Sequence, residues 1–380
     1  MNLSQKIKKI FQKKPKVIVV LGQTATGKSD FTVELAKRFD GEVISADSRQ
    51  VYRGMDLGSG KITKGEMQGV PHHLLDVVSP QETFSVADFQ KLGKGAIEDI
   101  LARGKVPIVC GGTGFYIDAL VHEMDFPAVP PNEELRKELS EKSLEELQEM
   151  YWSLQTNGRH SGLTLLSLSK KSSVKDKKIT KPRFRISYFQ NKFAMANLLR
   201  KYTFRNDKMY GNIDIQNPVR LIRAIEIIQA LGYLPEVKKK HPYDVLFIGL
   251  TLPKEKLDKR IYQRIVKRLN QGMLDEAQKL LQEGVSHERL QALGLEYRYM
   301  SKHLLGELSY EEMIDELYRA TVRFAKRQKT WFKRNKNIHW FSSAFFTKNA
   351  DTQKTTKLTQ NDPESAKEKI FSLVKKFLKK

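Results

Sequence analysis

The chain has 380 residues, which is enough length for a substantial core and two units. Its net charge at pH 7 is +23, from 67 lysines and arginines against 44 aspartates and glutamates. Its single cysteine, Cys110, excludes an internal disulfide and a zinc module with several cysteines, and the lack of a long apolar run excludes a membrane-spanning helix. We therefore expect a cytoplasmic protein with no membrane partner, and the positive charge favours a nucleic-acid partner, although basic tails alone would give the same excess.

A basic arm over residues 1–15 precedes a continuous apolar run at residues 17–21, which predicts a buried parallel strand. The next eight residues match the G-x-x-x-x-G-K-[ST] pattern of a P-loop, and an amphipathic helix follows. This order points backbone N–H groups and a helix N-terminus at phosphate oxygens. Lys28 is expected to reach the phosphates, and Ser29 to offer its hydroxyl to Mg²⁺. The predicted phosphate-binding residues are Gly22, Gln23, Thr24, Ala25, Thr26, Gly27, Lys28 and Ser29.

Two further strands are predicted to bring polar side chains to the same edge of a sheet. Asp47 follows the strand at residues 41–46, where it is a candidate for chemistry or, alternatively, a helix cap. The strand at residues 106–110 ends in a glycine turn that exposes Thr113. The alternation of strands and helices over residues 16–120 predicts an α/β fold, a doubly wound parallel P-loop sheet.

The middle of the chain has a different character. A proline-rich connector leads to a charged helical stretch at residues 132–154 and a Ser-, Thr- and Lys-rich segment at residues 155–182, which we expect to be a mobile loop. Basic and aromatic residues alternate over residues 183–193. They would suit RNA phosphates and unstacked bases, or they would form a small helical subdomain with an aromatic core.

Helices are predicted over most of residues 213–340, with one more strand at residues 245–250. Arg260, Arg264 and Arg268 recur every four residues and form a positive stripe, which suits phosphate recognition but is also common on exposed helices. Residues 321–334 mix basic and aromatic side chains and are a second candidate RNA face. A last amphipathic helix is expected over residues 364–377.

Several motifs now occur in a defined order. They are the P-loop and residues 47–52, 71–76, 84–89 and 111–116, continued by residues 217–226 and 323–332. The ordered set resembles the bacterial tRNA dimethylallyltransferase (tRNA isopentenyltransferase) family. Residues 291–297 match that family's glycine-tyrosine motif only in part, residues 155–210 lengthen its insert, and the zinc finger of eukaryotic members is absent.

The resemblance implies transfer of a dimethylallyl group from dimethylallyl diphosphate to N6 of the adenosine on the 3′ side of the anticodon in tRNA. It implies that Asp47 is the general base, that Thr113 orients the flipped-out adenine, and that the P-loop holds the leaving diphosphate with Mg²⁺ at Ser29. Arg268 is expected to be a second diphosphate clamp. The residues implied to contact the anticodon stem-loop of tRNA are Asp47, Ser48, Arg49, Gln50, Thr113, Arg136, Val219, Arg220, Leu221, Ile222 and Arg223.

We therefore expect a monomer with a transferase core over residues 16–120 and 211–343 and an inserted helical tRNA-binding region over 121–210. Residues 344–380 are expected to be a disordered basic tail with a candidate helix at its end. One alternative is a P-loop kinase or NTPase acting on a small metabolite, which the basic insert and arginine-rich helices disfavour. A second is an isopentenyltransferase acting on free adenine nucleotide, for which the insert would have little use. A third is a non-catalytic RNA-binding protein, which the intact Lys28, Ser29 and Asp47 disfavour.

Overall fold

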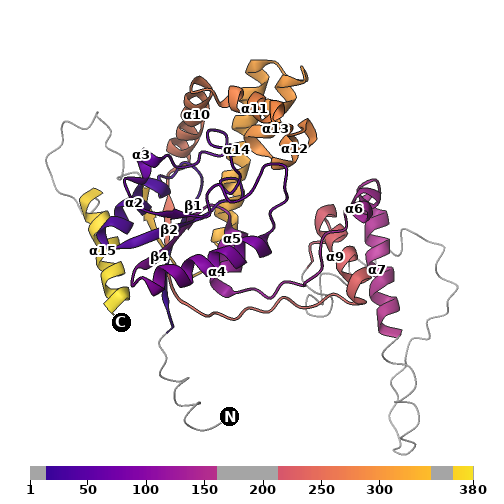
Figure 1. Ribbon diagram of the computed structural model, residues 1–380, viewed down its shortest axis with the longest axis horizontal. Coiled ribbons are helices and arrows are strands. Elements are labelled where there is room, and N and C mark those ends of the chain that lie inside the picture. The colour runs from indigo at the N-terminus through magenta and orange to yellow at the C-terminus, as the bar shows by residue number, and fades with distance from the viewer. Residues whose placement is uncertain (1–13, 161–212, 344–362, 380) are drawn as a thin grey trace, which may run out of the picture. The chain divides into compact units, whose positions relative to one another are not determined.

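A computed structural model describes residues 14–160, 213–343 and 363–379 (Figure 1). The contacts divide the chain into two compact units, Met1–Met124 with Lys239–Lys380, and Asp125–Lys238. Most of the basic arm, residues 161–182 of the expected loop, the basic-aromatic residues 183–193 and residues 344–362 of the tail lie outside the described residues. Within the described parts of the chain, none of the helices is long and apolar enough to cross a membrane.

The first unit is built on a parallel six-stranded sheet with the order β3-β2-β4-β1-β5-β6. Its strands are β1 (Lys16–Gly22), β2 (Gly41–Ala46), β3 (His72–His73), β4 (Val106–Gly111), β5 (Asp244–Thr251) and β6 (Ile338–Ser342). The central strands are apolar on both faces, as expected when helices cover both sides of a parallel sheet. The structure confirms the predicted fold class.

Alternate residues of β1 enter different cores, which makes the sheet doubly wound. Val17 and Val19 pack with helices α4 (Val86–Ala102) and α5 (Gly114–His122) on one face. Ile18 and Val20 pack on the other face with helices α2 (Lys28–Arg38) and α15 (Pro363–Lys379).

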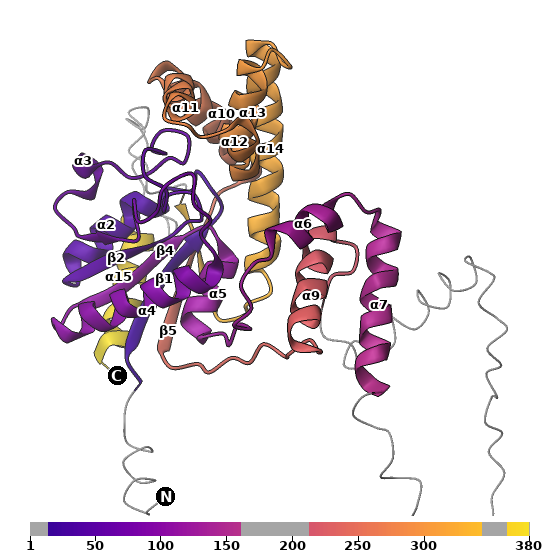
Figure 2. The same ribbon diagram turned by 45° about the vertical axis from the view of Figure 1, so that its right-hand side comes forward.

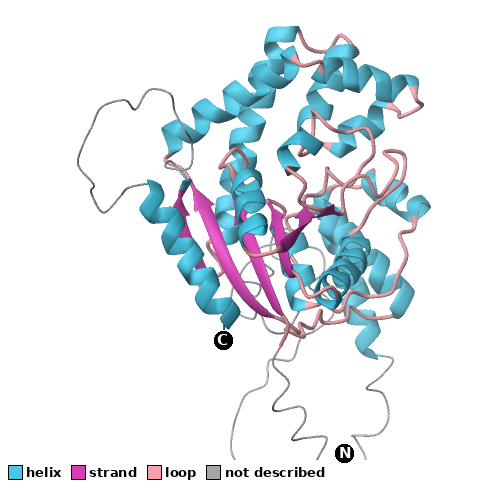
Figure 3. Ribbon diagram, turned by 60° about the vertical axis from the view of Figure 1, so that its left-hand side comes forward, coloured by secondary structure: helices cyan, strands magenta, loops and turns pink. Residues whose placement is uncertain are grey.

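The helix expected over residues 364–377 is α15, and it belongs to the core of the first unit. Figure 3 shows it lying along the sheet beside the strands. Ile370, Phe371 and Val374 are buried, and the Phe371 ring stacks on Phe31 of α2 with centroids 6.2 Å apart. The periodicity predicted the helix, whereas its packing depends on contacts with residues more than 300 positions earlier.

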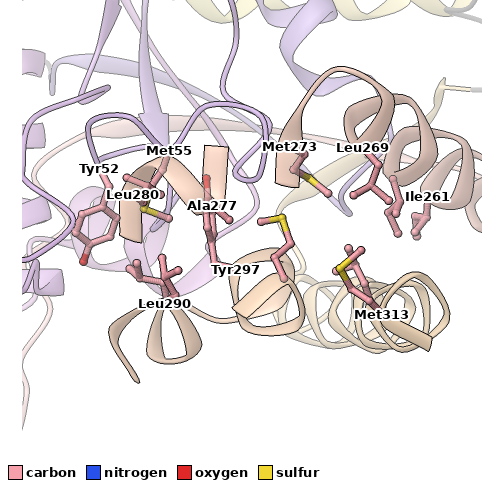
Figure 4. Close-up of a cluster of buried hydrophobic side chains, with 14 of the residues drawn as sticks. Tyr52, Met55, Ile261, Leu269, Met273, Ala277, Leu280, Leu290, Tyr297 and Met313 are labelled. Carbon is pink, nitrogen blue, oxygen red and sulfur yellow. The ribbon is translucent and has the colours of Figure 1, made fainter. Parts of the chain in front are cut away.

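A separate helical layer follows β5. Its elements are α10 (Lys254–Asn270), α11 (Met273–Gln282), α12 (His287–Leu293), α13 (Leu295–Leu304) and α14 (Tyr310–Phe332). Their apolar faces share one buried cluster with Tyr52 and Met55, which come from the chain after β2 (Figure 4). The loop after β2, which also carries the short helix α3 (Lys64–Met67), is therefore anchored in this layer.

The second unit contains three described helices, α6 (Glu133–Ser140), α7 (Leu144–His160) and α9 (Pro218–Leu231), which pack side by side (Figure 2). Leu147, Tyr151, Leu221 and Ile225 form its core. Residues 211–238 were expected in the transferase core, and the structure differs here. The apolar face of α9 packs on α6 and α7, so these residues belong to the second unit.

Candidate active site

The P-loop joins β1 to α2, and residues of α14 hold it in place. The Gln23 amide donates to the Ala325 carbonyl at 3.1 Å, and the Thr24 N–H donates to Gln328 Oε1 at 2.8 Å. Gly27 has a φ of 79°, a left-handed conformation that glycine adopts without strain. It is the N-cap residue of α2, so the loop ends and the helix begins there. The loop is thus preformed by contacts with a helix about 300 residues away in sequence.

Lys28 lies at the start of α2, and its ammonium group donates to the Gln23 carbonyl at 2.6 Å. Desolvation lowers the pKa of Lys28 to about 8, and the positive charge of Arg264 adds a smaller effect in the same direction. A bound anion would restore the charged form, so the electrostatics of Lys28 favour an anionic ligand.

The loop opens on a pocket of about 980 Å³ in the first unit. Its lining includes Thr24, Lys28, Ser29, Asp47, Gln50, Arg264 and Arg268. The structure therefore brings the predicted phosphate loop, the predicted base and the predicted second clamp to one cavity. Such a crevice beyond the carboxyl ends of parallel strands is where open α/β sheets bind ligands.

Asp47 and Thr113 follow neighbouring strands, because Ala46 of β2 pairs with Gly111 of β4. Asp47 Oδ1 accepts the Arg49 N–H at 2.8 Å, so this carboxylate closes a turn and also lines the pocket. The Ser48 N–H donates to Thr113 Oγ1 at 3.2 Å. The two side chains are thus held at one strand edge by the same short turn.

Arginine side chains of α10 face the P-loop. Arg264 donates to Thr24 Oγ1 at 3.3 Å, and Arg268 lies 3.6 Å from the Glu296 carboxylate of α13. Desolvation and the nearby charge of Arg268 lower the pKa of Arg264 to about 10. Burial raises the pKa of Glu296, although Arg268 opposes that shift.

Three residues of this site were not among the predicted catalytic or binding residues. Arg264 was noted only as part of a positive stripe, and its four-residue spacing with Arg268 was the signal that could have placed it. Gln328 and Glu296 lie within the segments 323–332 and 291–297, but no local pattern pairs them with Thr24 and Arg268, which are distant in sequence.

The expected tRNA contacts of the second unit form a group of their own around Glu226. Arg136 Nε lies 3.0 Å from the Glu226 carboxylate, and Arg223 also donates to it. Burial opposes ionisation of Glu226, but hydrogen bonds from Arg136, the Asn132 N–H and Arg223 outweigh it and lower its pKa. Both arginines therefore have an ion-pair role within this unit, which sequence spacing alone did not indicate.

The remaining predicted contacts on α9 differ in exposure. Val219 is 74% exposed, and Arg220 pairs with Asp214 at 3.3 Å on the surface. Ile222 is half-buried, whereas Leu221 is fully buried in the core of the unit. A direct RNA contact by Leu221 does not fit this burial, because its side chain packs against α6 and α7.

The residues of the pocket fit a Mg²⁺ ion whose donors come mainly from a bound phosphate ligand and water. The described residues contain no group of three or more His, Cys, Asp or Glu side chains arranged to hold a metal. Ser29 lies exposed in the pocket beside Lys28. Mg²⁺ at phosphate sites commonly uses one or two protein oxygens together with phosphate oxygens and water, which matches this donor set.

The parallel sheet, the glycine loop at its carboxyl edge and the converging lysine and arginines define a P-loop protein with a polyphosphate site. A family model described as IPP transferase matches residues 50–163 and 161–335. The chain is 40% identical over 340 residues to tRNA dimethylallyltransferase 2 of Treponema denticola, with 85% of this chain and 94% of that protein covered. It is 36% identical to tRNA dimethylallyltransferase of Halalkalibacterium halodurans, with 86% and 91% covered.

The chain therefore belongs to the tRNA dimethylallyltransferase (IPP transferase) family, which confirms the resemblance inferred from the motifs. A crystal structure of the full-length tRNA isopentenylpyrophosphate transferase from Bacillus halodurans matches with a TM-score of 0.56 at 36% identity, covering 87% of this chain and 90% of that one. A eukaryotic dimethylallyltransferase acting on tRNA matches with a TM-score of 0.62 at 23% identity over 96% of this chain and 80% of that one, which supports the fold alone.

Proposed function

We propose that this protein transfers a dimethylallyl group from dimethylallyl diphosphate to N6 of the adenosine on the 3′ side of the anticodon in tRNA. The observation that carries the proposal is that Asp47 and Lys28 line one pocket. In this reaction the allylic C–O bond breaks, a bond forms between N6 and the allylic carbon, and diphosphate leaves. The proton lost from N6 passes to the Asp47 carboxylate.

The diphosphate end of the reaction is assigned to the P-loop and α10. Negative charge grows on the leaving group as the C–O bond breaks, and preorganised N–H donors and cations stabilise it. Lys28, Arg264 and Arg268 supply those cations in this pocket. Mg²⁺ bound through the Ser29 hydroxyl would add further neutralisation of the diphosphate charge.

The acceptor end of the reaction is assigned to Asp47 and Thr113. The exocyclic amine of adenine cannot reach the allylic carbon while the base is stacked, so the base must leave the anticodon loop. We assign the orientation of that base beside the carboxylate to the Thr113 hydroxyl, which accepts the Ser48 N–H at 3.2 Å. The basic residues of α14 and the arginines of the second unit are proposed contacts for tRNA phosphates.

The names of the relatives support this activity over the alternatives. The relatives and structures described above are all named for tRNA, which favours neither a metabolite kinase nor an enzyme for free adenine nucleotide. A monomeric state and a cytoplasmic location stay predictions.

One assay tests the proposed function directly. Dimethylallyl diphosphate is supplied with tRNA or with AMP, and ATP is supplied alone, while the release of diphosphate or ADP is followed. We expect diphosphate release only with tRNA, together with prenyl-modified adenosine in the digested product. Brisk ATP hydrolysis without prenylated tRNA would contradict the proposal.

A variant then tests the role of Asp47. We expect Asp47→Ala to lower kcat by about 10²–10⁴-fold while tRNA binding is largely kept, because a general base acts in the transition state. Asp315→Asn, which alters an exposed pair with Arg319 at 2.7 Å, is the control. Equal loss of turnover and tRNA binding in Asp47→Ala would reassign Asp47 to binding.

A further inference from the structure

The segment Asp56–Gly60 forms one wall of the pocket and has no helix or strand of its own. Its position is set by Glu276 of α11. Glu276 Oε2 accepts the N–H groups of Asp56 at 2.8 Å and Leu57 at 2.7 Å, and its Oε1 accepts that of Gly58 at 2.9 Å. One carboxylate thus fixes three consecutive peptide groups by charge-assisted hydrogen bonds.

Tyr297 of α13 supports this carboxylate from the other side. Its hydroxyl donates to Glu276 Oε1 at 2.7 Å, and its ring is buried in the cluster of Figure 4. Burial, followed by the charge of Glu276, raises the pKa of Tyr297 well above its usual value, so the hydroxyl stays a donor. A Cβ at Gly58 would lie 2.5 Å from the Tyr297 ring, so the ring packs directly against the backbone of this wall.

The neighbouring residue of α13 pairs with the arginine that lies against the far end of the same wall. Glu296 lies 3.6 Å from Arg268, and both side chains are largely buried, at 16% and 15% exposure. Gly60 has a φ of +62°, and a Cβ there would lie 1.8 Å from Arg268 Nη2. The wall backbone therefore rests on the guanidinium group that we assign to the diphosphate.

We propose that Tyr297, Glu276 and Glu296 are positioning residues that set the spacing between the Asp56–Gly60 wall and Arg268, and so shape the diphosphate end of the pocket. The proposal rests on the proposed function. Preorganised cations stabilise developing charge only when their positions are fixed before the reaction. This assigns a role to the segment at residues 291–297, which matches the family's glycine-tyrosine motif only in part.

The first test compares two conservative variants with the wild-type protein. Tyr297→Phe removes only the hydroxyl, and Glu276→Gln keeps the shape but replaces one acceptor oxygen by a donor. We expect each to raise the KM for dimethylallyl diphosphate and the Kd for inorganic diphosphate by about tenfold, the effect of one charge-assisted hydrogen bond. The KM for tRNA should stay within about twofold of the wild-type value.

The matched control is Glu307→Gln, which alters a partly exposed ion pair with Lys302 at 3.1 Å, near the end of α13. It should leave the KM for dimethylallyl diphosphate unchanged. The double variant Tyr297→Phe with Glu276→Gln should resemble Glu276→Gln alone, because the tyrosine hydroxyl acts through that carboxylate. Glu296→Gln should weaken diphosphate binding in the same way through Arg268.

Some outcomes would overturn the inference without touching the proposed function. If the wild-type protein prenylates tRNA while the variants only lose thermal stability, or raise both KM values equally, these residues are structural. If the wild-type protein neither binds inorganic diphosphate nor prenylates tRNA, the proposed function itself fails.

Discussion

Gln328 of α14 accepts the Thr24 N–H of the P-loop at 2.8 Å, and its amide nitrogen donates to the Gly112 carbonyl at 3.0 Å. One side chain thus links the phosphate loop to the glycine turn that carries Thr113. A Cβ at Gly112 would lie 2.2 Å from the Gln328 amide, so the contact also requires glycine at that position. The two ends of the proposed reaction are therefore linked through one side chain, which also lines the pocket.

We expect Gln328→Ala to lower kcat for prenyl transfer by about tenfold or more, because the Thr24 N–H and the Gly112 carbonyl lose their partner and both loops relax. The free energy of unfolding should fall by about 1–3 kcal/mol. Steady-state kinetics and urea unfolding check both effects. Gln278→Ala, at an exposed position of α11, should change neither value. A fall in stability at unchanged kcat would show that Gln328 supports the fold alone.

The lowered pKa of Lys28 predicts a pH dependence of anion binding. Because this pKa lies near 8 in the free protein, an increasing share of Lys28 is neutral as the pH rises above it. We expect the advantage of the wild type over Lys28→Met in binding inorganic diphosphate to shrink by about tenfold between about pH 7 and pH 9. Calorimetric titrations of both proteins measure this ratio. A constant ratio would mean that Lys28 stays charged throughout.

Removing the charge of Glu226 is expected to destabilise the second unit locally. Glu226→Gln leaves Arg136 and Arg223 without their shared buried carboxylate, which should cost about 3 kcal/mol or more. We expect faster hydrogen–deuterium exchange over residues 218–231 and unchanged exchange in β1. Glu145→Gln, at the start of α7, is the control. Unchanged exchange in α9 would show that the pairs contribute little to this unit.

Glu42 of β2 is expected to contribute to the free energy of unfolding in a way that depends on acid pH. Its side chain is 1% exposed. Hydrogen bonds, of which that from Arg103 has the largest effect and those from His73 and Lys105 smaller ones, lower its pKa to about 2, although burial alone would raise the pKa. Because the folded pKa is depressed, its stabilisation is present above the ordinary value of 4.5 and is lost as the pH falls through about 2.

We therefore expect Glu42→Gln to reduce the free energy of unfolding by about 3 kcal/mol at neutral pH. The difference from the wild type should become smaller as the pH is lowered from about 5 to about 3. Thermal unfolding followed by circular dichroism checks this, with Glu98→Gln at an exposed site of α4 as the control. A difference that does not vary with pH would contradict an ionised Glu42.

The local parts of the structure could be predicted from sequence, because they depend on neighbouring residues. The apolar run before Gly22, the glycine loop and the placement of Asp47 at a strand end follow from periodicity and motif spacing. Long-range partners could not be predicted in this way. Gln328 reaches Thr24 across 304 positions, and Tyr297 reaches Glu276 from another helix, so no local pattern contains either contact.

The boundary of the second unit illustrates the same limit. The face of α9 is apolar, but periodicity does not say which helices cover it. The family resemblance implied that Arg220 and Arg223 both contact tRNA, whereas Arg223 donates to the buried Glu226 within its own unit. Which unit a helix joins is decided by packing partners and not by its own pattern.

The final helix α15 completes the sheet face formed by the first strand. Lys16 of β1 donates to the Leu378 carbonyl at 3.0 Å, and Phe371 covers Phe31. While the chain is being synthesised, Ile18, Val20 and Phe31 lack this cover until α15, which follows more than 300 residues later, has emerged from the ribosome. Docking of α15 is thus the step that closes this hydrophobic face, and the face is open to chaperones until then.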